Sequence, residues 1–234
     1  MTFYIILGLT FLASWLVSSR LKSKFRKYSQ IRLKSDLTGK EAAEQMLRDY
    51  GIYNVSVTCV PGELTDHYNP SNKTVNLSEA VYYSNSAAAV AVAAHECGHA
   101  VQHAKAYSML EFRSMMVPVQ NISANILNII MMLSFIGGTA LYRTFPIELV
   151  LLVIIGAYGV ITLFSLVTLP VEFDASKRAL AWIQQKGVAV GQEYAMSKDA
   201  LFWAAMTYVV AALGSIAMLM YYVLQFLGIS RDDD

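Results

Sequence analysis

Charged residues and cysteines are scarce in this chain. Asp, Glu, Lys and Arg make up 15% of its 234 residues, whereas soluble globular domains contain about 25%, so an ordinary water-soluble domain is excluded. Its two cysteines are too few for the disulfide framework of a small secreted scaffold. The formal net charge of +1 gives no electrostatic support for a nucleic-acid partner.

Hydrophobic residues are abundant instead, at 56% with a mean hydropathy of +0.43, and they gather in four runs. The first run, residues 3–17, is short for a span and could be a secretory signal peptide. A signal peptide has Lys or Arg before its apolar run, and none is present here, so we expect an uncleaved anchor. The other runs, about 117–141, 149–169 and 201–227, approach or exceed the roughly 20 residues that cross a bilayer. A short connection joins the second and third runs, which predicts an antiparallel hairpin.

Basic residues indicate how these spans are oriented. A cluster of Lys and Arg between Arg20 and Lys27 follows the first run, and positive charge beside a span stays cytoplasmic. Both termini are therefore expected outside the plasma membrane. The predicted segments are transmembrane helix 1 (1–19), a cytoplasmic unit (20–116), a transmembrane hairpin (117–169), a second cytoplasmic segment (170–200), transmembrane helix 4 (201–228) and an acidic tail (229–234).

The cytoplasmic unit has the pattern of a small α+β fold. Residues 38–41 (TGKE) match a capping box and begin a helix. Two β-type stretches follow, at 55–60 and 74–77, separated by a turn-rich segment. A second helix, capped by Ser84 or Ser86, then runs through a pair of histidines. This unit is too small for a large core of its own, so we expect it to pack against the spans.

Two histidines and a glutamate lie on that second helix, in the sequence HECGH. Because His95 and His99 are four residues apart, their imidazoles share one helical face and can converge on a single tetrahedral Zn²⁺ ion. Glu96 lies beside them and can take a proton from a water that the metal acidifies. This pattern predicts peptide-bond hydrolysis with one catalytic zinc ion as cofactor.

A catalytic zinc site needs a third protein ligand and one open position. His103 is the local candidate, but a third histidine one turn further along a straight helix drifts away from the ion. Glu172 follows the third span on the same predicted side as the histidine helix, and it would complete a His2Glu site. His67 lies in the turn-rich segment and is a weaker candidate for contact with metal or substrate.

Three sequence segments together resemble a known family: LTDHYNPSNKTVNLSE, SAAAVAVAAHECGHAVQHA and LPVEFDASKRA. They are similar to the YugP-like family of neutral zinc metallopeptidases of bacterial membranes, over nearly the whole chain. A more distant similarity links them to gluzincin membrane peptidases of the HtpX and CAAX-processing types. The resemblance implies zinc bound by His95, His99 and Glu172, with Glu96 as the catalytic base.

The chain departs from the gluzincin pattern beside its third ligand. Those peptidases carry a Glu-x-x-x-Asp motif, whereas here Ser176 stands where the Asp would be and Asp174 lies two residues earlier. Either residue could orient a zinc-bound histidine. By the same similarity, an edge strand at 74–78 would bind extended substrate. Arg178 or a nearby tyrosine is a separate candidate for stabilising the transition state.

These observations predict an α-helical multi-pass membrane protein with four transmembrane helices and a small gluzincin-like catalytic unit on the cytoplasmic side. Its expected partners are a membrane-associated polypeptide substrate and the lipid bilayer. One alternative is an intramembrane protease, although the apolar run at 87–94 is too short to span. The other is a non-catalytic membrane scaffold with a structural zinc ion, which would need four protein ligands.

Overall fold

The computed structural model describes residues 1–136 and 144–232, and most of them are helical. Its elements are α1 (Thr2–Tyr28), α2 (Gly39–Asp49), β1 (Ser56–Val60), β2 (His67–Asn69), β3 (Thr74–Ser78), α3 (Glu79–Tyr82), α4 (Ala87–Ala104), α5 (Ser108–Ile136), α7 (Ile147–Gln185) and α8 (Gln192–Asp232). Within the described residues, α1, α5, α7 and α8 are each long and apolar enough to cross a membrane. Residues 233–234 of the expected acidic tail lie outside the described residues, and residues 229–232 end α8.

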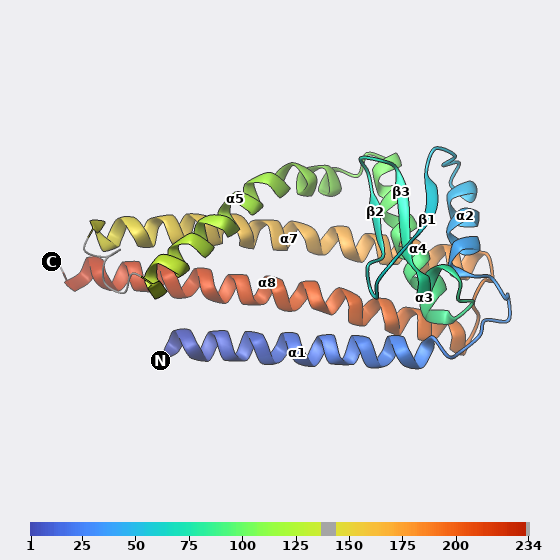
Figure 1. The fold of residues 1–234 in the computed structure, drawn as a ribbon, viewed down its shortest axis with the longest axis horizontal. Coiled ribbons are helices and arrows are strands. Elements are labelled where there is room, and N and C mark those ends of the chain that lie inside the picture. The colour runs from blue at the N-terminus through green and yellow to red at the C-terminus, as the bar shows by residue number, and fades with distance from the viewer. Residues whose placement is uncertain (137–143, 233–234) are drawn as a thin grey trace. The chain divides into compact units, whose positions relative to one another are not determined.

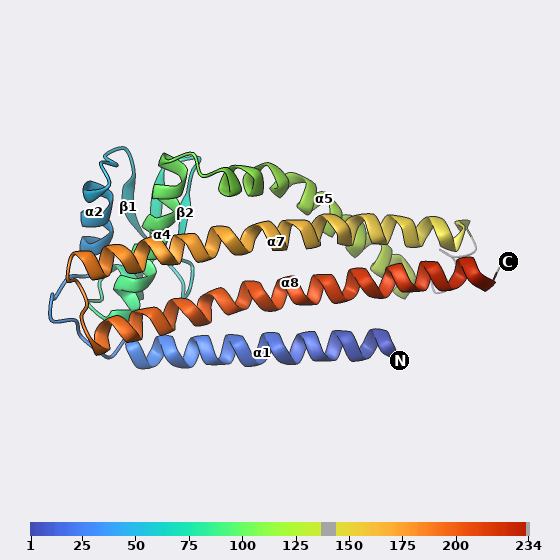
Figure 2. The same cartoon turned by 180° about the vertical axis from the view of Figure 1, so that it is seen from behind.

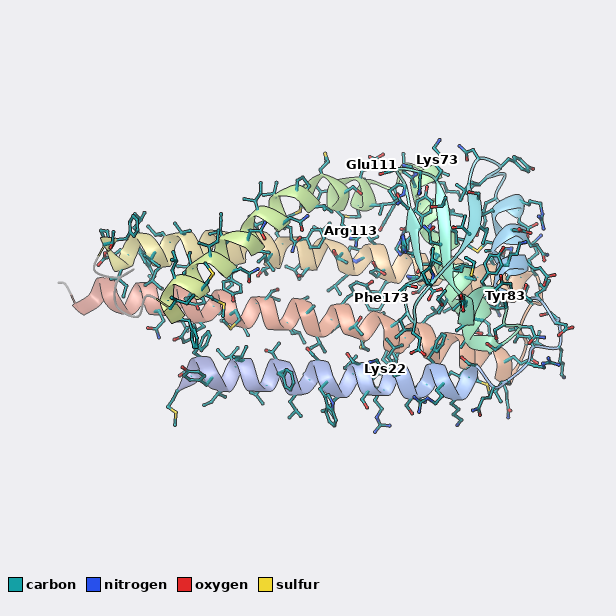
Figure 3. All side chains as sticks on the ribbon, viewed as in Figure 1. Lys22, Lys73, Tyr83, Glu111, Arg113 and Phe173 are labelled. Atoms are coloured by element: carbon teal, nitrogen blue, oxygen red, sulfur yellow. The ribbon has the colours of Figure 1, made fainter. Side chains whose placement is uncertain are left out.

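The chain divides into two compact units, of which the first consists of segments of the four long helices. It comprises residues 1–14, 112–168 and the chain from 208 onward. Its buried cluster contains Leu127, Val150, Ile154 and Ala157. On its polar side, Arg113 of α5 donates to the Thr168 hydroxyl at 3.3 Å (Figure 3). This unit is mostly apolar helix packed on apolar helix.

The second unit, residues 15–111 and 169–207, contains the sheet. Strand β3 is the central strand of the sheet, and it pairs parallel to β1 and antiparallel to β2 (Figure 1). The expectation that residues 74–78 form an edge strand is therefore wrong, because both sides of β3 are paired. The edge strand β2 falls in the segment expected to be turns, since three residues, HYN, carry no alternation that a sequence pattern could reveal. Lys73, with φ 54°, ends the turn of the β2–β3 hairpin (Figure 3).

The helix boundaries of this unit follow the predicted caps. Thr38 and Glu41 form a reciprocal capping box at the start of α2. The Ser86 hydroxyl accepts from the Ala89 N–H at the start of α4, so of the two candidate serines Ser86 is the cap. After α2, Gly51 adopts a φ of 71°, a left-handed conformation that favours glycine.

Helix α4 is the centre of the second unit. Its alanines and valines are almost all fully buried, because it contacts α2 and the sheet and also the C-terminal part of α7 (Figures 1 and 2). A Cβ atom at Gly98 would lie 2.6 Å from the Ala175 carbonyl oxygen, so glycine is what lets α4 approach the backbone of α7. On another face, the fully buried Cys97 directs its sulfur to the Ala43 carbonyl oxygen of α2, at 3.5 Å.

The contact at Gly98 generates a stability prediction. In Gly98→Ala the new methyl group must displace α7, which should lower the free energy of unfolding by about 1–3 kcal/mol, even though alanine favours helix more than glycine does. Gly156→Ala is the matched control, because nothing lies within 4 Å of a Cβ atom there. Thermal unfolding of the purified protein in detergent should show a lower midpoint for Gly98→Ala only. Equal midpoints for the two variants would contradict the close contact.

Candidate metal centre

Helix α4 presents two imidazoles on one face. The side chains of His95 and His99 are 14% and 12% exposed, and their ring centroids lie 4.8 Å apart. The i, i+4 spacing on an unbroken helix produces this arrangement. Both rings are therefore held at the edge of the buried core, with limited access to water.

Helix α7 brings a carboxylate to the two rings. Glu172 Oε2 lies 3.4 Å from His95 Nε2 and 3.6 Å from His99 Nε2, and the three ligand atoms are within 4.8 Å of one another. In a tetrahedral zinc site with ligand bonds of about 2.0–2.2 Å, neighbouring ligand atoms are about 3.3 Å apart. The two measured distances are close to this edge length, and the His, His, Glu donor set fits zinc.

The charge distribution at this point favours a cation. Glu172 is 3% exposed, and no donor among the described residues hydrogen-bonds its Oε2 atom. Burial acts to lower the pKa of His99, but the carboxylates of Glu172 and Glu96 outweigh burial and raise it. A buried carboxylate without a donor is strongly unfavourable, so the space between Oε2 and the imidazoles is suited to a metal ion.

Glu96 is the next residue on α4, and it is held by the edge strand. Its carboxylate is largely buried, with the residue 8% exposed, and Oε2 accepts the backbone N–H of Tyr68 in β2 at 2.9 Å. This bond fixes one carboxylate oxygen. The proposed base is thus anchored by the strand that borders the site.

The Nδ1 atoms of the two histidines contact different residues. Ser176 Oγ lies 3.1 Å from His95 Nδ1, and Gln102 Oε1 lies 3.0 Å from His99 Nδ1. Of the two residues considered for orienting a histidine, Ser176 does so directly, whereas Asp174 contacts Gln102 and not a ring. Sequence reasoning missed Gln102. The signal was available in its spacing, since it lies three residues after His99 on the same helix.

The remaining candidates are engaged elsewhere. His103 Nδ1 lies 2.8 Å from the Tyr68 hydroxyl, and His67 uses its two nitrogens on the Thr65 carbonyl and the Asn76 side chain. Neither histidine joins the group of converging ligand atoms among the described residues. Arg178 is ion-paired through its Nε atom with Asp174.

Comparison with known proteins agrees with a zinc site. The family described as "Putative neutral zinc metallopeptidase" matches residues 3–227. The chain is 40% identical over 228 residues to "Putative membrane protease YugP" of Bacillus subtilis (strain 168), covering 97% of this chain and 96% of the relative. No solved structure matches the chain. The chain therefore belongs to this family of zinc metallopeptidases.

Proposed function

We propose that this protein is a membrane-bound zinc endopeptidase that cleaves cytoplasm-facing or membrane-proximal polypeptides, with Glu96 as its general base. The observation that carries the proposal is the placement of Glu96. It is adjacent in sequence to one of three converging ligands, largely buried, and anchored by Tyr68. A purely structural metal site has no use for such a carboxylate.

The protein's own residues divide the work of hydrolysis. His95, His99 and Glu172 would hold a zinc ion, which would supply a Lewis acid for the scissile carbonyl and for the attacking water. Glu96 accepts the proton of the attacking water through the carboxylate oxygen that Tyr68 does not hold. It then donates that proton to the leaving amine as the C–N bond breaks.

Strand β2 is suited to align the substrate. The Tyr68 N–H that bonds Glu96 points away from β3, and the N–H and C=O of one residue in an antiparallel strand point to the same side. The Tyr68 carbonyl oxygen therefore faces the outer edge of β2. A substrate in extended conformation can donate a backbone N–H to it, which holds the next peptide bond beside Glu96. This role was expected for residues 74–78, but β3 is paired on both sides.

Two observations disfavour the other functions. A structural zinc site needs four protein ligands, and within the described residues three converge while His103 contacts Tyr68. An intramembrane protease would need its zinc helix in the bilayer. Helix α4 is not one of the four apolar candidates for a span, and it contacts the sheet.

The base assignment is tested by Glu96→Gln. The side-chain amide oxygen of the glutamine can still accept the Tyr68 N–H, but the amide cannot take a proton from water. Peptide cleavage should therefore fall by about 10²–10⁴-fold. Cleavage of a quenched peptide library by the purified protein measures this, and metal analysis should still find zinc. Cleavage at the wild-type rate in Glu96→Gln would refute the mechanism.

The third ligand is tested by Glu172→Gln. Removal of the carboxylate charge leaves only two neutral imidazoles as strong ligands. Loss of a residue that merely supports a ligand costs about 10–100-fold in metal affinity, so loss of a ligand should lower zinc affinity, measured by chelator competition, by at least that factor. Glu111→Gln serves as the control, because Glu111 is an exposed residue of α5 (Figure 3). Retention of wild-type affinity in Glu172→Gln would remove Glu172 from the ligand set.

The cytoplasmic position of the catalytic unit is tested with its native cysteines. Cys59 is exposed on β1, and Cys97 is buried. An impermeant maleimide should not label intact cells expressing the protein, and it should label inverted membrane vesicles at Cys59. Cys59→Ser should abolish this signal, since Cys97 is shielded. Labelling of Cys59 in intact cells would place the unit outside.

A further inference from the structure

We propose that Gln102 is a positioning residue that holds His99 in the Nδ1–H tautomer, so that the Nε2 lone pair faces the metal position. The inference rests on the proposed function, because it deals with how one of the zinc ligands is presented. Gln102 is fully buried in α4, and a buried side-chain amide must satisfy both its donor and its acceptor.

The orientation of the Gln102 amide follows from its acceptors. Nε2 lies 2.8 Å from the Val171 carbonyl oxygen and 2.8 Å from Asp174 Oδ2. Both partners can only accept, so the atom between them is the amide nitrogen, and the flipped amide is excluded. Gln102 Oε1 is then the atom that faces His99 Nδ1 at 3.0 Å.

An amide oxygen has no hydrogen to give, so the proton of this bond belongs to His99 Nδ1. A neutral imidazole protonated at Nδ1 has its lone pair on Nε2. That nitrogen is the one that lies 3.6 Å from Glu172 Oε2. Gln102 therefore determines which nitrogen of His99 can bind a metal.

Asp174 and Arg178 hold Gln102 in place. Arg178 is ion-paired with the same Asp174 oxygen that accepts from Gln102, and its guanidinium lies over the Tyr107 ring, 5.9 Å from the centroid. The side chains of Asp174 and Arg178 are 25% and 22% exposed, so this ion pair connects the buried Gln102 amide to the surface of the unit. This explains why Asp174 is present although it contacts neither imidazole.

The two histidines are thus held differently. His95 contacts the Ser176 hydroxyl, which can donate or accept and so does not select a tautomer. His99 contacts an acceptor whose orientation is set by two further residues. The geometry assigns His99 as the preorganised ligand and His95 as the adaptable one.

The test removes the acceptor that faces His99. In Gln102→Met the side chain keeps a similar length but offers no oxygen to His99 Nδ1, and zinc affinity measured by chelator competition should fall by about 10–100-fold.

The tautomer can also be read directly in the wild-type protein, whatever the variants do to folding. With ¹⁵N-labelled histidine, the zinc-free protein should show His99, at a pH where it is neutral, protonated at Nδ1 and not at Nε2, whereas zinc bound at Nε2 would by itself leave the proton on Nδ1. An unprotonated Nδ1, or equal zinc affinity of Gln102→Met and wild type, would overturn the proposal.

These outcomes separate the two proposals. Wild-type protein that binds zinc, and whose His99 carries its proton on Nδ1, but that cleaves no peptide would remove the peptidase function and leave the role of Gln102 intact. Normal cleavage together with an unprotonated Nδ1 would remove the role of Gln102 alone. Wild-type protein that binds no zinc would overturn both.

Discussion

The approach of the α4 and α7 backbones at Gly98 and Ala175 is the contact on which the site depends. Glu172 lies about one helical turn before Ala175, and Ser176 follows it directly. Because α7 comes this near, both side chains reach the imidazoles of α4 without any intervening loop. A site built on two packed helices is positioned more rigidly than one built on loops, and here a single missing side chain, at Gly98, makes that packing possible.

The buried position of the donors links metal binding to stability. Glu172 and the two histidines are removed from most water, and the carboxylate has no hydrogen-bond donor at Oε2 among the described residues. The free site therefore carries an electrostatic penalty that a divalent cation relieves. Since a ligand that binds only the folded state stabilises it, zinc bound at this site would stabilise the fold of this unit.

Sequence reasoning found what is encoded locally. The capping box at Thr38, the Ser86 cap and the pairing of His95 with His99 each depend on residues within four positions, so their spacing predicts them. Glu172 lies more than 70 residues from the histidines, and it was supported mainly by family resemblance. Strand β2 was missed because its three residues form a strand only by pairing with β3. The role of Gln102 was missed because its partners, Val171 and Asp174, come from another helix.

Cys97 shows what the direction of one side chain means for chemical robustness. The thiol lies between Glu96 and Gly98, yet its sulfur faces α2, and burial raises the pKa of this thiol well above its ordinary value. Oxidants attack thiolates that are exposed, and Cys97 is neither ionised nor accessible. Zinc sites with cysteine ligands release their metal under oxidative stress, whereas this centre offers zinc only nitrogen and oxygen ligands. The ligand set therefore contains no thiolate that an oxidant could remove.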